Sequence, residues 1–159
     1  MSNGKIDFER LSRAHWTPEQ RENAELVVDF VQKIMNDHDF NAVRQLQGQA
    51  PYKQHSQGIS DGISGVTSYL EKFVKSFPEF SYDIKSVIVD GDMVSIHSHG
   101  TLKKKHRGND KKGLNIIDTW RIENGRLVEH WDAIQGIDFG MRLYAVLIGG
   151  KRLNSNGLF

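Results

Sequence analysis

The spacing of apolar residues changes once along the chain, from helical periodicity to strict alternation. Over residues 18–35 apolar side chains recur every three or four positions. The preceding Thr17-Pro18-Glu19-Gln20 offers a hydroxyl N-cap, a proline at the first helical position and a capping-box glutamine. These features predict a helix that begins at Pro18. The same reasoning predicts a short second helix over 39–46 and a third over 65–77, ended by Pro78.

Beyond residue 80 the period is two, which predicts consecutive antiparallel strands over 80–89, 93–102, 115–122 and 126–134. Polar turns separate the outer pairs, and the basic segment LKKKHRGNDKKG separates the inner pair. Helices followed by such strands indicate an α+β fold, in which a cone-shaped, strongly curved antiparallel sheet wraps on three N-terminal helices.

The two ends of the chain lack a clear period. Residues 1–16 are polar, and we expect them to form an N-terminal arm. Residues 136–159 are rich in apolar side chains without a clean pattern, and we treat them as a C-terminal extension of the domain that spans 17–135.

Composition narrows the function classes. A chain of 159 residues with 38% hydrophobic residues fits one domain. Its 21 basic and 20 acidic side chains nearly cancel, so we expect no nucleic-acid partner. The absence of cysteine excludes thiolate catalysis and cysteine zinc sites. With no signal-peptide core and no apolar run of about 20 residues, we expect a cytoplasmic protein with no membrane partner.

The hairpin around Glu123-Asn124-Gly125 decides which side chains share a face. If Asn124-Gly125 forms a two-residue turn, Asp118 lies opposite Trp131, and His130 and Asp132 lie on the other face. If all three residues form the loop, Asp118 lies opposite His130, and Asp118, Trp120, His130 and Asp132 share one face with several isoleucines. We favour the second register, because it lets Arg121 pair diagonally with Glu129.

The favoured register predicts two carboxylates and an imidazole among apolar side chains. Their pKa values should be driven apart, so that one carboxyl is protonated while the other is ionised. Asp132 is then a candidate general base or acid, and Asp118 and His130 are candidates to tune it. The alternative is structural: Asp132 capping a turn, and Asp118 paired with His130 for stability.

Three segments resemble a known family: YKQH at 52–55, DGDMVSIHSHG at 90–100 and NIIDTWRIENGRLVEHWDAIQ at 115–135. Together with the order of helices and strands, they resemble SnoaL-like proteins of the nuclear transport factor two-like superfamily. The resemblance covers about residues 18–135 and is most specific at EHWDAIQ. It implies an α+β cone with an internal pocket, usually a homodimer, and in the name-giving members an intramolecular aldol cyclisation of polyketides without metal or cofactor.

The resemblance also implies roles for particular residues. Asp132 matches the aspartate of the family's H-W-D motif, which acts as the acid/base residue, and Asp118 matches a pocket position. His55 and His99 match polar positions at the rim or wall of the pocket. Residue type and location add candidates for substrate binding: Tyr52 in the loop with His55, His97 on the same face as His99, and Trp120.

We therefore expect a cofactor-free acid/base enzyme of aldol, cyclase or isomerase type, acting on a small polyketide-like carbonyl compound. One alternative is a ligand-binding homodimer without turnover, and another is a dimeric interaction module whose partner surface is the C-terminal tail. We expect no metal, because the histidine and carboxylate spacing fits none of the compact ligand motifs. The lysine-rich segment 102–113 is typical of a solvated hairpin tip.

Overall fold

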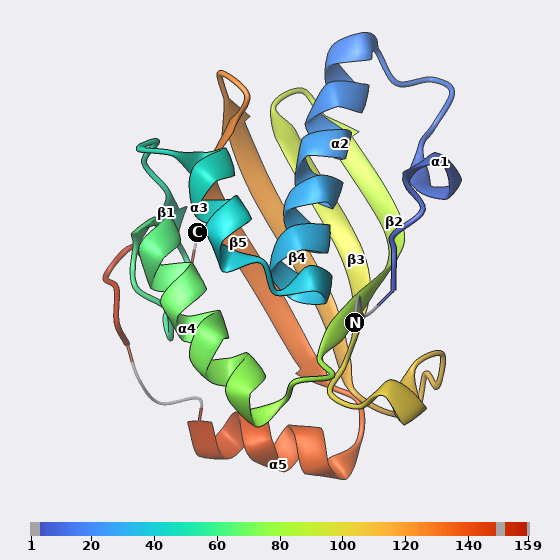
Figure 1. The fold of residues 1–159 in the computed structure, drawn as a ribbon, viewed down its shortest axis with the longest axis vertical. Helices are drawn as coiled ribbons and strands as arrows, with labels where there is room; N and C mark the ends of the chain where they lie inside the picture. The colour runs from blue at the N-terminus through green and yellow to red at the C-terminus, as the bar shows by residue number, and fades with distance from the viewer. Residues whose placement is uncertain (1–3, 149–151, 159) are drawn as a thin grey trace.

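The computed structural model describes residues 4–148 and 152–158. In this structure one layer of helices lies across one face of a curved sheet, and a last helix crosses the end of both layers (Figure 1). The predicted α+β architecture is confirmed, with the three predicted helices packed on the sheet.

In chain order the helical segments are α1 (Phe8–Leu11), α2 (Pro18–Val31) with its π-helical continuation η1 (Gln32–Asp37), α3 (Phe40–Gln47), α4 (Gly62–Ser76), the 3-10 turn η2 (Lys104–His106) and α5 (Phe139–Ile148). The three predicted helices, observed as α2, α3 and α4, begin and end close to the predicted positions, and three further helical segments among the described residues were not predicted. The capping box at the start of α2 forms as predicted: the Thr17 hydroxyl accepts from the Gln20 amide, and the Gln20 side chain accepts from the Thr17 amide.

The sheet has the strand order β1-β5-β4-β3-β2. Its strands are β1 (Lys53–Gln54), β2 (Ser81–Asp90), β3 (Met93–Thr101), β4 (Leu114–Glu123) and β5 (Arg126–Gly136). The four long strands pair antiparallel, as predicted. The short β1 was not predicted: it lies in a segment interpreted as a loop, and it pairs parallel with β5 at Glu129 and His130.

Both ends of the chain contribute more than the sequence suggested. The N-terminal segment, expected as a polar arm, forms α1 and buries Leu11 in the core, where Phe8 also packs. The C-terminal segment contains α5, which runs below the sheet and α4 in Figure 1. Phe77, which follows α4, packs edge-on against Tyr144 of α5 with ring centroids 6.0 Å apart.

The turn between β4 and β5 has two residues, Asn124 and Gly125. Both have positive φ values, 50° and 67°, as a type I′ hairpin turn requires. Glu123 pairs with Arg126, and the preceding residue pairs with Leu127. The prediction of a three-residue loop is therefore wrong.

A β-bulge close to this turn places the later side chains of β5 on the predicted face of the sheet. The pairing shifts between Arg121 and the next residue, so Val128 has no partner and Arg121 lies directly opposite Glu129. From the bulge onward Trp120 lies opposite His130, so the predicted pairing of His130 with Asp118 is also wrong. The extra residue nevertheless leaves the candidate side chains on the face that the favoured register predicted.

Candidate functional site

A cavity of about 360 Å³ lies between the helices and the inner face of the sheet. Its wall is mostly aromatic and aliphatic and comes from α2, α4, the sheet and α5; examples are Phe30, Tyr69, Phe73 and Ile116. Among the described residues, the lining includes no lysine or arginine. An enclosure of this kind suits an apolar ligand held by a few polar groups.

The polar groups gather on one side of this cavity. Asp118 and Trp120 come from β4, His130 and Asp132 come from β5, and Tyr52 precedes β1. The structure thus brings together five of the eight residues predicted for the site.

Gln54 determines that Nδ1 of the His130 ring carries a hydrogen. The backbone amide of Ser56 donates to Gln54 Oε1 over 2.8 Å, which identifies this atom as the oxygen. His130 Nδ1 lies 2.9 Å from the same oxygen and must therefore carry a hydrogen and donate it. His130 Nε2 is left to face Asp118 Oδ1 at 3.2 Å. A hydrogen bond there requires one proton, carried by either partner.

Burial favours the protonated form of Asp118. The residue is 2% exposed, and desolvation raises the pKa of its carboxyl, while the hydrogen bond from His130 opposes the rise. The nearby charge of Asp132 acts in the same direction as desolvation. Asp118 Oδ2 is buried, and no group among the described residues forms a hydrogen bond with it. A buried oxygen without a partner is costly, so this atom is available to a ligand in the cavity.

Asp132 has a different environment. It is half-buried and lies directly opposite Asp118 across the two strands. Within the described part of the chain, no hydrogen bond or ion pair engages its carboxylate. The site therefore contains one carboxyl that is buried against His130 and one that faces the cavity unpaired.

Tyr52 keeps its proton. Burial raises the pKa of its hydroxyl far above the ordinary value, although the hydrogen bond from Trp120 lowers it somewhat. Trp120 Nε1 donates to the Tyr52 oxygen over 3.0 Å, so the hydroxyl hydrogen is free to point elsewhere. Tyr52 can therefore donate to a ligand oxygen beside Asp118.

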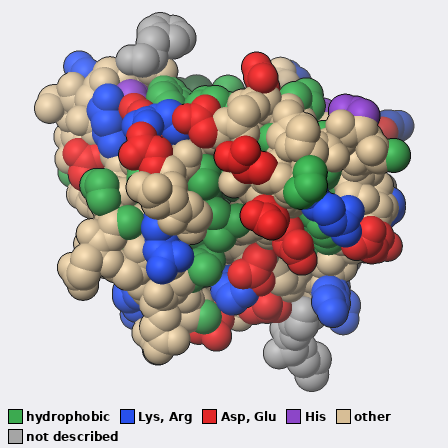
Figure 2. Space-filling model, turned by 90° about the horizontal axis from the view of Figure 1, so that it is seen from above, with side chains coloured by type: hydrophobic (Ala, Val, Ile, Leu, Met, Phe, Trp, Pro, Cys, Tyr) green, Lys and Arg blue, Asp and Glu red, His purple; other side chains and the backbone are tan. Residues whose placement is uncertain are grey.

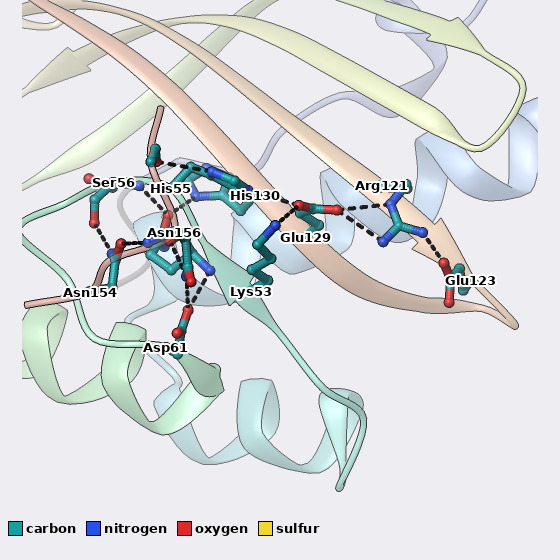
Figure 3. Close-up of polar contacts among 12 residues, drawn as sticks. Lys53, His55, Ser56, Asp61, Arg121, Glu123, Glu129, His130, Asn154 and Asn156 are labelled. Atoms are coloured by element: carbon teal, nitrogen blue, oxygen red, sulfur yellow. Dashed lines mark hydrogen bonds and ion pairs between the residues drawn. The ribbon is translucent and has the colours of Figure 1, made fainter. Parts of the chain in front are cut away.

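His55 points away from the cavity, contrary to the expectation that it contacts a ligand there. Its Nε2 lies 2.8 Å from Glu129 Oε1, and its ring stacks on Trp131 with centroids 4.8 Å apart. Lys53 and Arg121 also bind Glu129, so this carboxylate joins three basic side chains (Figure 3). The cause is strand alternation along the edge strand β1, which turns alternate residues to opposite faces.

His97 and His99 do not line the cavity either. Both lie on the outer face of β3, opposite the inward-facing Ile96 and Ser98. His97 is exposed and pairs with Asn115 at 2.6 Å, and His99 lies 2.6 Å from the carbonyl oxygen of Lys112. His99 lines a separate polar crevice under the N-terminal segment. The expected contact of these two histidines with a ligand in the main cavity is therefore not supported.

One cluster in the described part of the chain has the donors for a metal ion. Asp118, His130 and Asp132 each offer a ligand atom, and these atoms lie within 4.8 Å of one another. Two carboxylates and one imidazole could accept a divalent cation. However, His130 Nε2 and Asp118 Oδ1 already satisfy each other, which leaves Asp118 Oδ2 and Asp132 as the open donors.

Sequence reasoning missed Gln54 and α5. Gln54 is fully buried and orients His130. The sequence feature that could have identified it is its position two residues after Tyr52, because residues two apart lie on the same face of a strand. From α5, Met141 and Tyr144 complete the cavity wall. Nothing in the unpatterned tail predicted this.

The end of the chain fastens the segment that carries Gln54. The Asn156 side chain donates to the Gln54 carbonyl oxygen over 2.9 Å and to Asp61 over 2.6 Å. The Asn154 side chain donates to the carbonyl oxygens of Ser56 and Ile59. Figure 3 shows this tail lying against the loop. The C-terminal extension is therefore part of the scaffold of the site.

A curved sheet closed by helices around an apolar cavity with a carboxyl-imidazole cluster defines an α+β protein with a small-molecule pocket. The family model described as SnoaL-like polyketide cyclase matches residues 25–140, and the chain belongs to this family. None of the curated proteins compared matches the chain in sequence.

Solved structures show the same fold at low sequence identity. A candidate SnoaL-like polyketide cyclase from Jannaschia sp. CCS1 is 16% identical with a TM-score of 0.63, over 85% of this chain and 95% of that one. A candidate polyketide cyclase from Bacillus cereus ATCC 10987 is 16% identical with a TM-score of 0.62, over 94% and 99%. AclR, a candidate hydroxylase from Streptomyces galilaeus, is 19% identical with a TM-score of 0.58, over 82% and 86%. Since these descriptions differ, the fold alone does not fix the reaction.

Proposed function

We propose that this protein is a cofactor-independent acid/base enzyme that closes or rearranges a small polyketide-like carbonyl compound by aldol-type chemistry. The observation that carries the proposal is the pairing of two unlike carboxyls in an otherwise apolar cavity. Asp118 is buried beside His130, which favours its protonated form, and Asp132, unpaired within the described residues, faces the same space. Separated environments of this kind supply an acid and a base at one pH.

In the proposed reaction Asp132 removes a proton from the carbon next to a carbonyl. The resulting enolate carbon attacks a second carbonyl carbon, which forms the new carbon–carbon bond and leaves negative charge on the second oxygen. The proton of Asp118 first points at His130. The Asp118 carboxyl then reorients so that this proton faces the cavity, and it transfers the proton to that oxygen. The proton on Asp132 then returns to Asp118, and both carboxyls regain their starting states.

The other polar groups position the substrate and hold the acid. Tyr52 donates to a carbonyl oxygen and stabilises the enolate. Gln54 keeps the hydrogen of His130 on Nδ1, so that Nε2 can share the proton of Asp118. The lining without cationic side chains favours a neutral substrate, because a carboxylate or phosphate would enter without a counter-ion.

The test is turnover of neutral di- and triketones that can cyclise, followed by chromatography of substrate and product. Asp132→Asn should lower kcat about 100-fold or more while ligand affinity and fold are kept. The matched control is Asp90→Asn at the exposed β2–β3 turn, which should leave kcat unchanged. Turnover that survives in Asp132→Asn would contradict the assignment of the base.

A second candidate, a binding protein without turnover, is favoured by the apolar cavity alone. It predicts that the wild type binds such ketones and yields no product, and that Asp132→Asn binds them equally well. The homodimer implied by the family resemblance remains a prediction, which sedimentation velocity would check. The interaction-module hypothesis is weakened, since deleting 136–159 would remove Met141 and Tyr144 from the cavity wall.

A further inference from the structure

Helix α5 has two apolar faces rather than one. Met141, Tyr144 and Ala145 line the cavity and form the inner face. At 100° per residue, Phe139, Leu143, Val146 and Leu147 lie on the opposite side. A helix on the surface of a monomer ordinarily places polar side chains there.

The outer face is open to solvent. Phe139 is 81% exposed, Val146 79%, Leu147 74% and Leu143 46%. Their spacing of four, three and one residues makes them one stripe rather than scattered apolar positions. A contiguous exposed apolar surface of this kind marks a site of interaction.

A lysine-rich loop lies beside this stripe. The loop that connects β3 to β4 is tied to the start of α5, because the Gly113 amide donates to Asp138 Oδ2 and the Gly113 carbonyl accepts from the Ile137 amide. Both elements lie at the lower end of the molecule in Figure 1. The loop carries five exposed lysines: Lys103, Lys104, Lys105, Lys111 and Lys112. None of them forms an ion pair within the described part of the chain, although the charge of Lys112 helps to lower the pKa of Asp138.

The opposite end of the molecule has a different surface. Figure 2 looks down on that end and shows acidic and basic side chains mixed together. The two turns that reach it carry Asp90, Asp92 and Glu123. In a chain with a net charge of only +1, the exposed lysines are thus concentrated at one end, while both signs of charge are mixed at the other. Such a charge distribution orients a protein toward an anionic surface.

We propose that the end formed by α5 and the lysine loop docks on an anionic lipid bilayer, with the outer stripe of α5 in the headgroup region. An apolar helix face flanked by exposed lysines matches the two parts of such an interface, acyl chain and anionic headgroup. A second copy fits less well: a symmetric contact through this end would bring two lysine loops into one interface. An acidic protein would match the lysines but not the stripe of four large apolar side chains.

This inference revises the expectation of no membrane partner. That expectation rested on the lack of a spanning segment, and no helix in the described residues is long and apolar enough to cross a bilayer. A helix that lies in the interface needs only one apolar face. Because the inner face of α5 lines the cavity, docking would place the cavity wall against the lipid. An apolar ligand dissolved in the bilayer would then have a short path to the cavity.

The test is co-sedimentation of the full chain with sucrose-loaded vesicles. Vesicles of phosphatidylcholine with roughly one third phosphatidylglycerol should bind the protein at least about tenfold more tightly than pure phosphatidylcholine. High salt should release much of the bound protein. The double change Val146→Ser/Leu147→Ser should weaken binding about tenfold. Its matched control is Ile88→Ser, at a position 66% exposed near the far β2–β3 turn, which should bind as the wild type does.

The second set of variants in this vesicle experiment reverses the charge of lysines in the loop. Lys104→Glu/Lys105→Glu should weaken binding to the anionic vesicles about tenfold, whereas Arg13→Glu/Arg126→Glu, at two exposed positions outside α5 and the loop, should not. Equal binding to both kinds of vesicle, or none, would overturn the proposal. So would sedimentation velocity showing a dimer that Val146→Ser/Leu147→Ser dissolves, because the stripe would then belong to a second copy.

Discussion

Asp118 and Asp132 are direct cross-strand neighbours whose side chains share the inner face of the sheet. Two ionised carboxylates in this position would repel each other. The pKa of the buried member of the pair, Asp118, is raised by burial first and by the charge of Asp132 in addition, which favours the protonated form that relieves this repulsion. Placing the two carboxyls opposite each other therefore has a cost in stability that grows as pH rises.

Asp118→Asn should remove this cost. A carboxyl whose folded pKa is raised contributes stability that is fully present below the unfolded pKa and is lost as pH rises through the folded pKa. The amide does not titrate, so its advantage over aspartate in free energy of unfolding should grow as pH rises through the folded pKa of Asp118. Urea denaturation at pH 5 and pH 8 measures the difference, and kcat should fall about 100-fold or more. Equal destabilisation at both pH values would show that the carboxyl is needed only for packing.

Gln54→Met tests the orientation of His130. The change keeps the volume but removes the oxygen that accepts from Ser56 and from His130, and leaves one buried donor and one half-buried donor without that partner. We expect a loss of about 2–3 kcal/mol in free energy of unfolding and a lower kcat. Gln45→Met, at an exposed position on α3, is the control and should change neither quantity. Full activity in Gln54→Met would mean that His130 needs no fixed tautomer.

Glu129 should make the protein sensitive to acid. Although desolvation opposes it, the hydrogen bonds from His55, Lys53 and Arg121 lower the pKa of Glu129 from 4.5 to about 2. Its stabilising contribution is therefore present above pH 4.5 and lost as pH falls toward 2, about 3 kcal/mol in all. Glu129→Gln should flatten this part of the stability profile. Denaturation curves at pH 7 and pH 3 provide the measurement.

The control for that profile is Glu123→Gln, which alters an exposed partner of the same Arg121. A solvent-exposed ion pair contributes about 0–1 kcal/mol, so the acid sensitivity should remain. An unchanged acid profile in Glu129→Gln would assign the sensitivity to other carboxylates.

The tail should support the site from a distance. In Asn154→Ala/Asn156→Ala the side chains that bind the loop over 54–61 are lost, while the cavity lining is kept. We expect a lower Tm and a lower kcat with little change in the affinity for an apolar ligand. Hydrogen exchange at the Ser56 amide, which should accelerate, reports the loosening directly. An unaltered exchange rate would contradict the role of the tail.

The elements that sequence predicted were those with a clear period. The stripe of α2 and the alternation of the four long strands gave the fold, and the shared face of Asp118, His130 and Asp132 followed from pairing Arg121 with Glu129. The details of that pairing were wrong, because a bulge at Val128 has no signature in the alternation of apolar residues. The predicted turn was one residue too long and the predicted strand lacked the bulge. Each error changes the face of the later side chains, so together they left the predicted face correct.

The direction of His55 and the role of α5 could not be predicted for a different reason. His55 follows a strand of two residues that exists only through its parallel pairing with β5, a contact between segments far apart in sequence. The helix α5 is apolar on both sides, so no periodic stripe marks its inner face. Both features depend on tertiary contacts rather than on local pattern.

The bulge at Val128 means that the inward face of β5 depends on a single uncharged residue outside the cavity lining. Deleting Val128 would remove the bulge and keep the present pairs, because Leu127 and Glu129 already lie opposite neighbouring residues of β4. A slip of one residue that placed Val128 opposite Arg121 would instead turn every later side chain of β5 to the opposite face. Trp131 would then point at the cavity, and His130 and Asp132 would point away from it. The composition of this pocket is thus set by the register of one hairpin as much as by the identity of its acids.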